Sequence, residues 1–259
     1  MSDFAADKSH PRYQSLLMRH RLEMAAKAGM LADSALIAHG RGEAYDYLLG
    51  ETTIPSAHDA TMEALAHLQN ADSAVISLNG NAIALAGKEL MQLASLLKIP
   101  VEVNIFYRTP ERMKALLNHL YEIRDTNQLD VEILGEKPDA KIPGLEGPRA
   151  KCCESGIFNS DVILVPLEDG DRCEALVAMG KVVLVIDLNP LSRSAKMGSV
   201  TIVDELSRVA ENLLHGAMQV VAAGKLNMRI TTSISPMALA RSAVQCAFKT
   251  LAVMNWAIH

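Results

Sequence analysis

A β-α-β pattern in the second half of the chain constrains the fold more than any other feature. The apolar run Val162–Val165 is too short for a helix and is rich in β-branched residues, as buried strands are. After it, Asp171 and Glu174 have the spacing of a capping box that opens a helix, and Gly180 is placed to end that helix. A second apolar run, Val182–Ile186, follows at once. Crossovers of this kind join parallel strands, so the pattern predicts a parallel sheet.

Four more apolar runs have the length and composition of strands, and amphipathic segments separate them. Six strands that alternate with helices predict an α/β fold with a mainly parallel sheet flanked by helices. Extra helices are expected at both ends of a single α/β domain, with an N-terminal helical segment (1–50), a core (51–223) and a C-terminal helical tail (224–259). The additional strands are expected at Ala74–Leu78, Val101–Phe106, Val131–Leu134 and Ser199–Val203.

The composition argues against several classes of protein. A net charge of −5 over 259 residues is not the basic excess of a nucleic-acid binder. The four cysteines have no C-x-x-C spacing, so we expect them to be reduced and the protein to be cytoplasmic. The N-terminus lacks the apolar stretch of a signal peptide. Two long apolar helices are expected, one from about Ala82 to Leu97 and one from Pro236 to about Ala257. Charged residues interrupt both, which argues against a membrane span.

Polar loops follow four of the predicted strands. In a parallel sheet the carboxyl ends of the strands share one edge, and ligands bind in the crevice outside that edge. We therefore expect the four loops to converge on one ligand site. A turn capped by asparagine or serine is the alternative explanation for such a loop taken alone. The loops are Asn79–Asn81, Tyr107–Arg108, Glu168–Asp171 and Asp187–Ser194.

The segment His39-Gly40-Arg41-Gly42 is a further candidate for ligand contact. It is expected to end a short helix that begins near Leu31, with two glycines that let the backbone approach a ligand and a guanidinium group between them. A plain turn between helices is the alternative. Arginine suits phosphate because of its fork geometry, and neither a P-loop nor a dinucleotide-binding glycine motif is present. The residues themselves therefore predict a phosphate-rich ligand.

Six segments in register resemble the archaeal-type phosphopantothenate synthetases. Together they extend from about Ser9 to Val203, and the similarity ends past about Ala210. Six motifs in the same order are far more specific than any one of them. The segments are SHPRY (Ser9–Tyr13) with Arg19, IAHGRGEAYDYLLGE (Ile37–Glu51), SLNGNAIAL (Ser77–Leu85), NIFYRTPERMKA (Asn104–Ala115), VPLEDGDRCEALVAMGK (Val165–Lys181) and IDLNPLSRSAKM (Ile186–Met197).

The resemblance implies a Rossmann-like fold, a homodimer and a ligase. The implied reaction condenses 4-phosphopantoate with β-alanine to 4′-phosphopantothenate in coenzyme A synthesis, and it converts ATP to AMP and diphosphate. The expected partners are therefore small molecules. The ATP contacts that the resemblance implies are Arg19, Arg41, Asp187, Leu188, Asn189, Arg193, Ser194, Glu205 and Leu206.

The implied chemistry agrees with the polar side chains expected along the sheet edge. A carboxylate must first attack the α-phosphate of ATP to form an acyl-adenylate, and arginines with Mg²⁺ can stabilise the departing diphosphate. We expect Arg41 and Arg193 to serve in this way, with Asp169 and Asp171 as magnesium ligands. No residue is identified as the base for the β-alanine amine. The candidates for binding the phosphate of 4-phosphopantoate are Asn79, Gly80, Asn81 and Arg108.

Two other functions fit the same residues. A small-molecule kinase needs a similar phosphate-binding site but releases ADP. A nucleotide-binding regulatory module would use the arginines only to sense its ligand and would show no turnover. The product nucleotide separates the kinase from the ligase, and turnover separates the regulatory module from both.

Overall fold

The computed structural model describes residue 4 and residues 6–223, and six strands in this range form one parallel sheet. The strand order is β3-β2-β1-β6-β7-β8, and all neighbouring strands run parallel. This is the order of doubly wound nucleotide-binding folds, so the predicted Rossmann-like α/β fold is confirmed. The strands are β1 (Ala74–Leu78), β2 (Val101–Val103), β3 (Ile133–Leu134), β6 (Val162–Pro166), β7 (Val182–Ile186) and β8 (Val200–Ile202).

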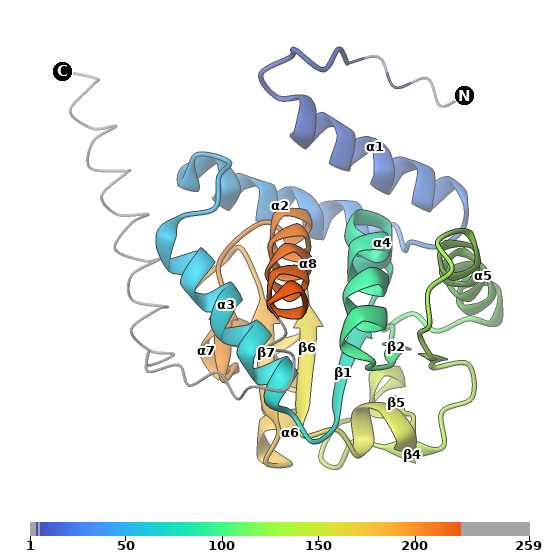
Figure 1. Ribbon diagram of the computed structural model, residues 1–259. Coiled ribbons are helices and arrows are strands. Elements are labelled where there is room, and N and C mark those ends of the chain that lie inside the picture. The colour runs from blue at the N-terminus through green and yellow to red at the C-terminus, as the bar shows by residue number, and fades with distance from the viewer. Residues whose placement is uncertain (1–3, 5, 224–259) are drawn as a thin grey trace.

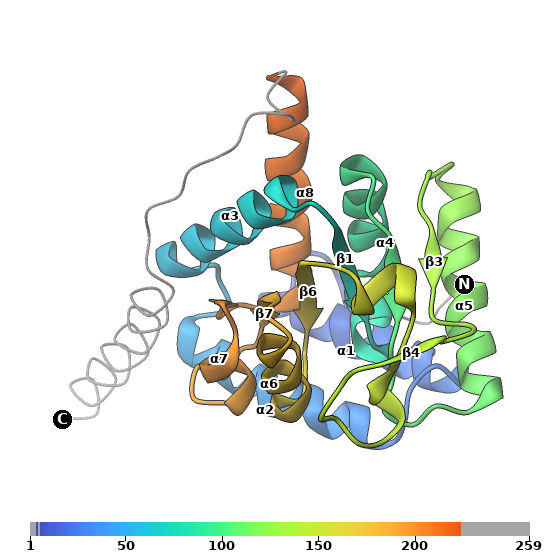
Figure 2. The same ribbon diagram turned by 90° about the horizontal axis from the view of Figure 1, so that it is seen from below.

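Helices cover both faces of the sheet. Figure 1 shows α3, α4 and α8 in front of the strands, and the turned view of Figure 2 places α6 on the opposite face, with the small hairpin of β4 (Ala140–Lys141) and β5 (Lys151–Cys152). The helices α1 and α2 lie across the edge toward which β6 points (Figure 1). The helices are α1 (Tyr13–Lys27), α2 (Ser34–Leu49), α3 (Pro55–Asn70), α4 (Gly80–Leu97), α5 (Pro110–Thr126), α6 (Gly170–Ala178), α7 (Arg193–Met197) and α8 (Leu206–Ala222).

The central strands are buried on both faces, which explains why their sequences are continuous apolar runs. Successive side chains alternate between two cores. Ile76 and Leu164 belong to the larger core under α3, α4 and α8, whereas Val75 and Ile163 belong to the smaller core on the α6 face. Each such aliphatic side chain contributes roughly 1.5–3 kcal/mol by its burial. The apolar pattern therefore fixes the central strands.

The strand order reverses between β1 and β6, and Asn79 closes the gap between their carboxyl ends. Its side-chain amide donates to the carbonyl oxygens of Pro166, at 2.9 Å, and Leu167, at 3.0 Å. Its side-chain oxygen accepts from the backbone N–H of Ala82 and so caps α4. Leu167 itself has a left-handed backbone with φ of 54°. The chain is thus held in a sharp turn at the point where doubly wound sheets bind ligands.

The helix α2 is continuous, and the helix end predicted at His39 to Gly42 is wrong. Gly40 and Gly42 lie inside the helix. Tertiary contacts stabilise it despite its glycines: Arg208 at the start of α8 donates to the Asp46 carboxylate of α2 and also to Asp204. A Cβ atom at Gly42 would lie 3.4 Å from Leu188, an ordinary van der Waals distance, so α2 packs against the loop after β7 at this point. Arg41 is therefore presented by a helix and not by a loop.

The predicted capping box at the start of α6 is also wrong. The helix begins at Gly170, with Asp169 in the N-cap position and no side-chain cap hydrogen bond. Asp171 and Glu174 instead pair with Arg193, at 2.5 Å and 3.0 Å. Because α6 begins at Gly170, Asp171 lies inside the first turn of the helix and not in the N-cap position that a capping box requires.

The loop predicted at Asp187–Ser194 is shorter in the structure. The short helix α7 begins at Arg193, and the Ser192 side chain caps it. The helical tail predicted for residues 224–259 lies outside the described residues. Within residues 4 and 6–223, no helix has the length and apolar character needed to cross a membrane.

Gly135 and Gly144 give a test of how the strand edge is packed. A Cβ atom at Gly135 would lie 2.4 Å from the carbonyl oxygen of Val103 in β2, whereas Gly144 has open space around it; their φ angles are +106° and +73°. We expect Gly144→Ala to cost about 1–2 kcal/mol through its backbone conformation alone. Gly135→Ala should cost about 1–3 kcal/mol more because β2 must move. Urea unfolding of both variants measures the difference, and equal losses would contradict the packing.

Candidate functional site

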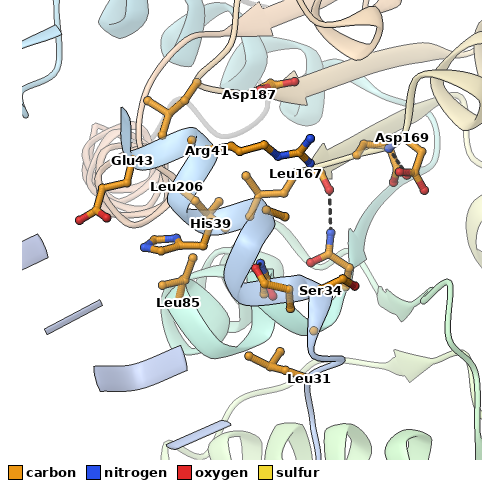
Figure 3. Close-up of a pocket in the computed structure, with 18 of the residues that line it drawn as sticks. Leu31, Ser34, His39, Arg41, Glu43, Leu85, Leu167, Asp169, Asp187 and Leu206 are labelled. Atoms are coloured by element: carbon orange, nitrogen blue, oxygen red, sulfur yellow. Dashed lines mark hydrogen bonds between the residues drawn. The ribbon is translucent and has the colours of Figure 1, made fainter. Parts of the chain in front are cut away.

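One cleft of about 890 Å³ lies at the carboxyl-terminal edge of the sheet. The helix α2 forms its outer wall, and the loops after the strands form its inner wall (Figure 3). The predicted convergence of the four polar loops is therefore confirmed, since each of them contributes residues to the cleft. The cleft-lining residues from those loops are Asn79, Gly80, Asn81, Tyr107, Glu168, Asp169, Asp187, Leu188, Asn189, Ser192 and Ser194, with Glu205 and Leu206 at the start of α8.

Asp187 shapes the half of the cleft formed by β7 and β8. Its carboxylate accepts from the backbone N–H of Asn189, at 2.9 Å, and from the Ser192 hydroxyl, at 2.5 Å. Burial raises the pKa of Asp187, and these hydrogen bonds together with the charge of Arg41 oppose that rise. The carboxylate is therefore held rigidly at the end of β7, where a carboxylate suits the hydroxyl groups of a ribose.

Glu205 is a helix cap as well as a cleft residue. It is buried, and its carboxylate accepts from the backbone N–H groups of Ser207, at 2.8 Å, and Arg208, at 3.3 Å. Burial raises its pKa although these bonds favour the charged form. The side chain is thus occupied within α8. A nucleotide in the cleft can contact only the portion of the Glu205 side chain that lines it.

Arg41 extends from α2 toward Leu167 and Asp169, whereas His39 and Glu43 point to the other side of the helix (Figure 3). Among the residues that the structure describes, Arg41 has no hydrogen bond or ion pair. Its charge lies close enough to Asp187 to lower that group's pKa. The cleft therefore contains an exposed guanidinium group that is free to bind an anion.

Arg19 and Arg193 do not line the cleft, although the resemblance implies that both contact ATP. The guanidinium group of Arg19 binds Glu43 at 2.9 Å. The side chain of Arg193 is 64% exposed and binds the two carboxylates of α6 described above. The structure thus brings one of these three arginines into the cleft. The other two lie outside it, Arg19 paired with the cleft-lining Glu43 and Arg193 with the carboxylates of α6.

Only some of the loop residues predicted to bind 4-phosphopantoate line the cleft. Asn79, Gly80 and Asn81 line the cleft, but Arg108 does not. The Arg108 guanidinium group donates to the carbonyl oxygens of Gly135 and Glu136 and so holds the loop after β3. Arg112 of α5 lines the cleft in its place, where it donates to the carbonyl oxygens of Tyr107 (2.8 Å) and Leu31 (3.3 Å).

Sequence reasoning missed a buried network of charges behind the cleft. Glu168 binds two buried arginines, Arg149 at 2.7 Å and Arg172 at a shorter distance. Arg149 also binds Asp169 at 2.8 Å, and Arg172 donates to the Ser77 hydroxyl. The i,i+4 spacing of Glu168 and Arg172 was a detectable signal. Arg149 gave none, because it lies in an irregular polar connection far from Glu168 in the sequence.

His39 is the only histidine of the described residues that lines the cleft. Burial lowers its pKa; the nearby charge of Arg19 acts in the same direction, and Glu43 and Asp46 oppose it. The lowered pKa makes the imidazole predominantly neutral at pH 7. Glu43 in turn accepts from Ser15 and Arg19, so the α1 side of the cleft is closed by internal polar contacts.

The carboxylates predicted to hold Mg²⁺ do not form a site. Asp169 lines the cleft and is bound by Arg149, whereas Asp171 lies outside it and is bound by Arg193. No group of three or more His, Cys, Asp or Glu side chains within residues 4 and 6–223 has the arrangement of a metal site. Because one of these two carboxylates lies in the cleft and the other outside it, they are a poor fit for a shared divalent cation.

Comparison with known proteins gives a consistent result. Residues 56–247 match the family model described as phosphopantothenate/pantothenate synthetase. A protein of Thermococcus onnurineus named 4-phosphopantoate–beta-alanine ligase is 52% identical over 201 residues, which cover 78% of this chain and 76% of that protein. Proteins with the same name from Thermococcus kodakarensis (50%, covering 82% and 80%) and Methanosarcina mazei (44%, covering 85% and 83%) are also similar.

The different positions of Arg41 and Arg193 lead to opposite expectations for two matched variants. Arg41→Gln should weaken ATP binding about 10- to 150-fold, because a hydrogen bond to a charged group contributes about 1.5–3 kcal/mol. Arg193→Gln removes only exposed ion pairs and should change ATP binding by about twofold or less. Isothermal titration of ATP into both variants decides this. A larger loss for Arg193→Gln would restore its predicted role.

Proposed function

The chain belongs to the phosphopantothenate/pantothenate synthetase family, and on this basis we propose that it is an ATP-dependent ligase that condenses 4-phosphopantoate with β-alanine. The products are 4′-phosphopantothenate, AMP and diphosphate, and the reaction belongs to coenzyme A synthesis. The observation that carries the proposal is the cleft at the strand-order reversal. Arg41, which has no partner among the described residues, lies on one wall and Asn79–Asn81 on the other.

The acid must be activated before the amine can react with it. A carboxylate oxygen of 4-phosphopantoate attacks the α-phosphorus of ATP, the bond to the β-phosphate breaks, and diphosphate leaves. The amine of β-alanine then attacks the acyl carbon, and AMP leaves with the former carboxylate oxygen. Arg41 is placed to stabilise the charge that develops on the phosphates during the first step.

The two substrates of the first step are assigned to opposite halves of the cleft. ATP is placed against Asp187, Leu188, Asn189 and Leu206, at the ends of β7 and β8. The acid is then placed at the N-terminus of α4, where unpaired backbone N–H groups favour an anion, with Arg112 beyond it. In this arrangement Arg41 lies near the junction, where the acyl-adenylate forms.

Mg²⁺ is proposed to enter with ATP, bound by the phosphate oxygens, because the residues predicted as its ligands do not form a site. When bound it would neutralise charge on the diphosphate. The protein's own contribution to that charge is then carried by Arg41. This assignment agrees with the carboxylates that line the cleft, most of which are already bonded within the protein.

Transfer of an oxygen isotope tests the acyl-adenylate directly. With ¹⁸O in the carboxylate of 4-phosphopantoate, we expect one ¹⁸O atom in the phosphate of AMP, because the acyl C–O bond breaks in the second step. AMP should form only when both organic substrates are present, and EDTA should stop its formation. Formation of ADP would instead assign the protein as a small-molecule kinase. Bound ATP without any turnover would assign it as a regulatory module.

A homodimer and a cytoplasmic location are proposed from the resemblance. The three cysteines in the described range are free and buried, which agrees with a reducing compartment. On α8, Met218 and Val221 are exposed immediately before the tail that begins at residue 224. We propose that this tail stabilises the dimer by covering apolar surface of this kind.

Truncation after Ala223 tests the role of the tail. We expect light scattering to report a dimer for the full chain and a shift toward monomer for the truncated chain, because apolar contacts between the subunits are lost. Circular dichroism should report retained helical structure in both. A dimer of unchanged stability after truncation would remove the tail from the interface.

A further inference from the structure

We propose that Asp169 binds the ammonium group of β-alanine and that Arg149 positions its carboxylate for this purpose. The inference rests on the proposed ligase function and adds the amine subsite to it. It follows from three observations on the described residues: the exposure of Asp169 in the cleft, its contact with a buried arginine, and its position opposite Arg41.

Asp169 is the carboxylate that remains available to a ligand. Arg149 binds one of its oxygens, but its side chain is 58% exposed, whereas the other acidic side chains of the cleft are far less exposed and are bonded within the protein. Asp46 and Glu43 are paired with arginines, Glu168 is paired with two, and Asp187 and Glu205 accept from neighbouring hydroxyl and backbone N–H groups. A cationic substrate that enters the cleft therefore meets Asp169 as its accessible partner.

The orientation of Asp169 is fixed from behind. Arg149, whose side chain is 9% exposed, donates to one oxygen of Asp169, to one oxygen of Glu168 and to Asn104, and it forms an ion pair with the other Glu168 oxygen. Glu168 accepts from the backbone N–H of Asp169, at 2.7 Å. The backbone turn at Leu167, with its positive φ, brings these two acidic residues to the cleft. The second oxygen of Asp169 has no hydrogen bond within the described part of the chain and is free for a ligand.

The position suits the amine that attacks an acyl-adenylate. Asp169 follows β6 at the reversal of strand order, beside the N-terminus of α4, and Arg41 points toward it from α2 (Figure 3). Phosphate and acyl groups between Arg41 and α4 would therefore lie next to Asp169. An aliphatic amine is a cation at neutral pH, so an exposed carboxylate with a free oxygen is a suitable partner for it.

The test compares Asp169→Asn with the matched variant Asp171→Asn, whose carboxylate lies two residues away but outside the cleft. Three measurements are made on each full-length protein. The first is ATP–diphosphate exchange with 4-phosphopantoate and no β-alanine. The second is the overall rate as β-alanine is varied. The third is hydroxamate formation with hydroxylamine, a nucleophile that is neutral at pH 7 and does not need an ammonium site.

We expect Asp169→Asn to raise the KM for β-alanine about tenfold or more, because a charge-assisted hydrogen bond is lost. Its exchange rate and hydroxamate formation should stay within about twofold of the wild type, as should all three measurements for Asp171→Asn. Asp169→Glu should restore part of the affinity for β-alanine.

Two results would overturn the assignment: an unchanged KM for β-alanine in Asp169→Asn, or a loss of exchange in that variant. The second would place Asp169 in the adenylation step, for example as a ligand of Mg²⁺. Absence of exchange in the wild type would instead overturn the ligase function, and the ammonium site with it.

Discussion

The paired bonds of Glu168 to Arg149 and Arg172 are the interaction on which the cleft depends. All three side chains are almost completely buried, and a buried charge without its partner costs several kcal/mol. The network therefore holds β6, the following turn and the irregular segment around Arg149 in one arrangement. Ser77 and Asn104 extend it to the ends of β1 and β2. The floor of the cleft is thus set by polar bonds between three strands and not by apolar packing alone.

The wall of the cleft formed by α2 depends on a second ion pair of the same kind. Arg208 joins Asp46 of α2 to Asp204 before α8, and Thr53 binds the same Asp204. The helix carries two glycines and would be weak in isolation. Its position over the strand ends is therefore a property of tertiary contacts, and so is the direction in which Arg41 points.

The sequence was sufficient for the sheet because buried parallel strands are apolar without interruption, as Val162–Pro166 and Val182–Ile186 are. It was also sufficient for the edge at which the loops gather. It was not sufficient to predict the partners of Arg108, Arg149 and Arg193. The sequence alone does not distinguish an arginine that binds a ligand from one that binds a backbone carbonyl or a distant carboxylate. Pairs such as Arg149 with Glu168 connect residues that no local pattern relates. The division into segments 1–50, 51–223 and 224–259 stays a prediction.

The charges of the cleft fall into two groups with different physical roles. Those of Glu168, Arg149 and Arg172 are buried and bonded to one another, and Asp169 balances the second guanidinium charge, so these groups fix geometry. Those of Arg41 and Asp169 are exposed, and water screens them while the cleft is open. Bound substrates displace that water, and the same two charges then act in a medium of lower dielectric constant. Buried bonds already fix Asp169 and the α2 helix that carries Arg41. Substrate binding therefore strengthens the electrostatic effect of these two side chains with little further ordering of the backbone.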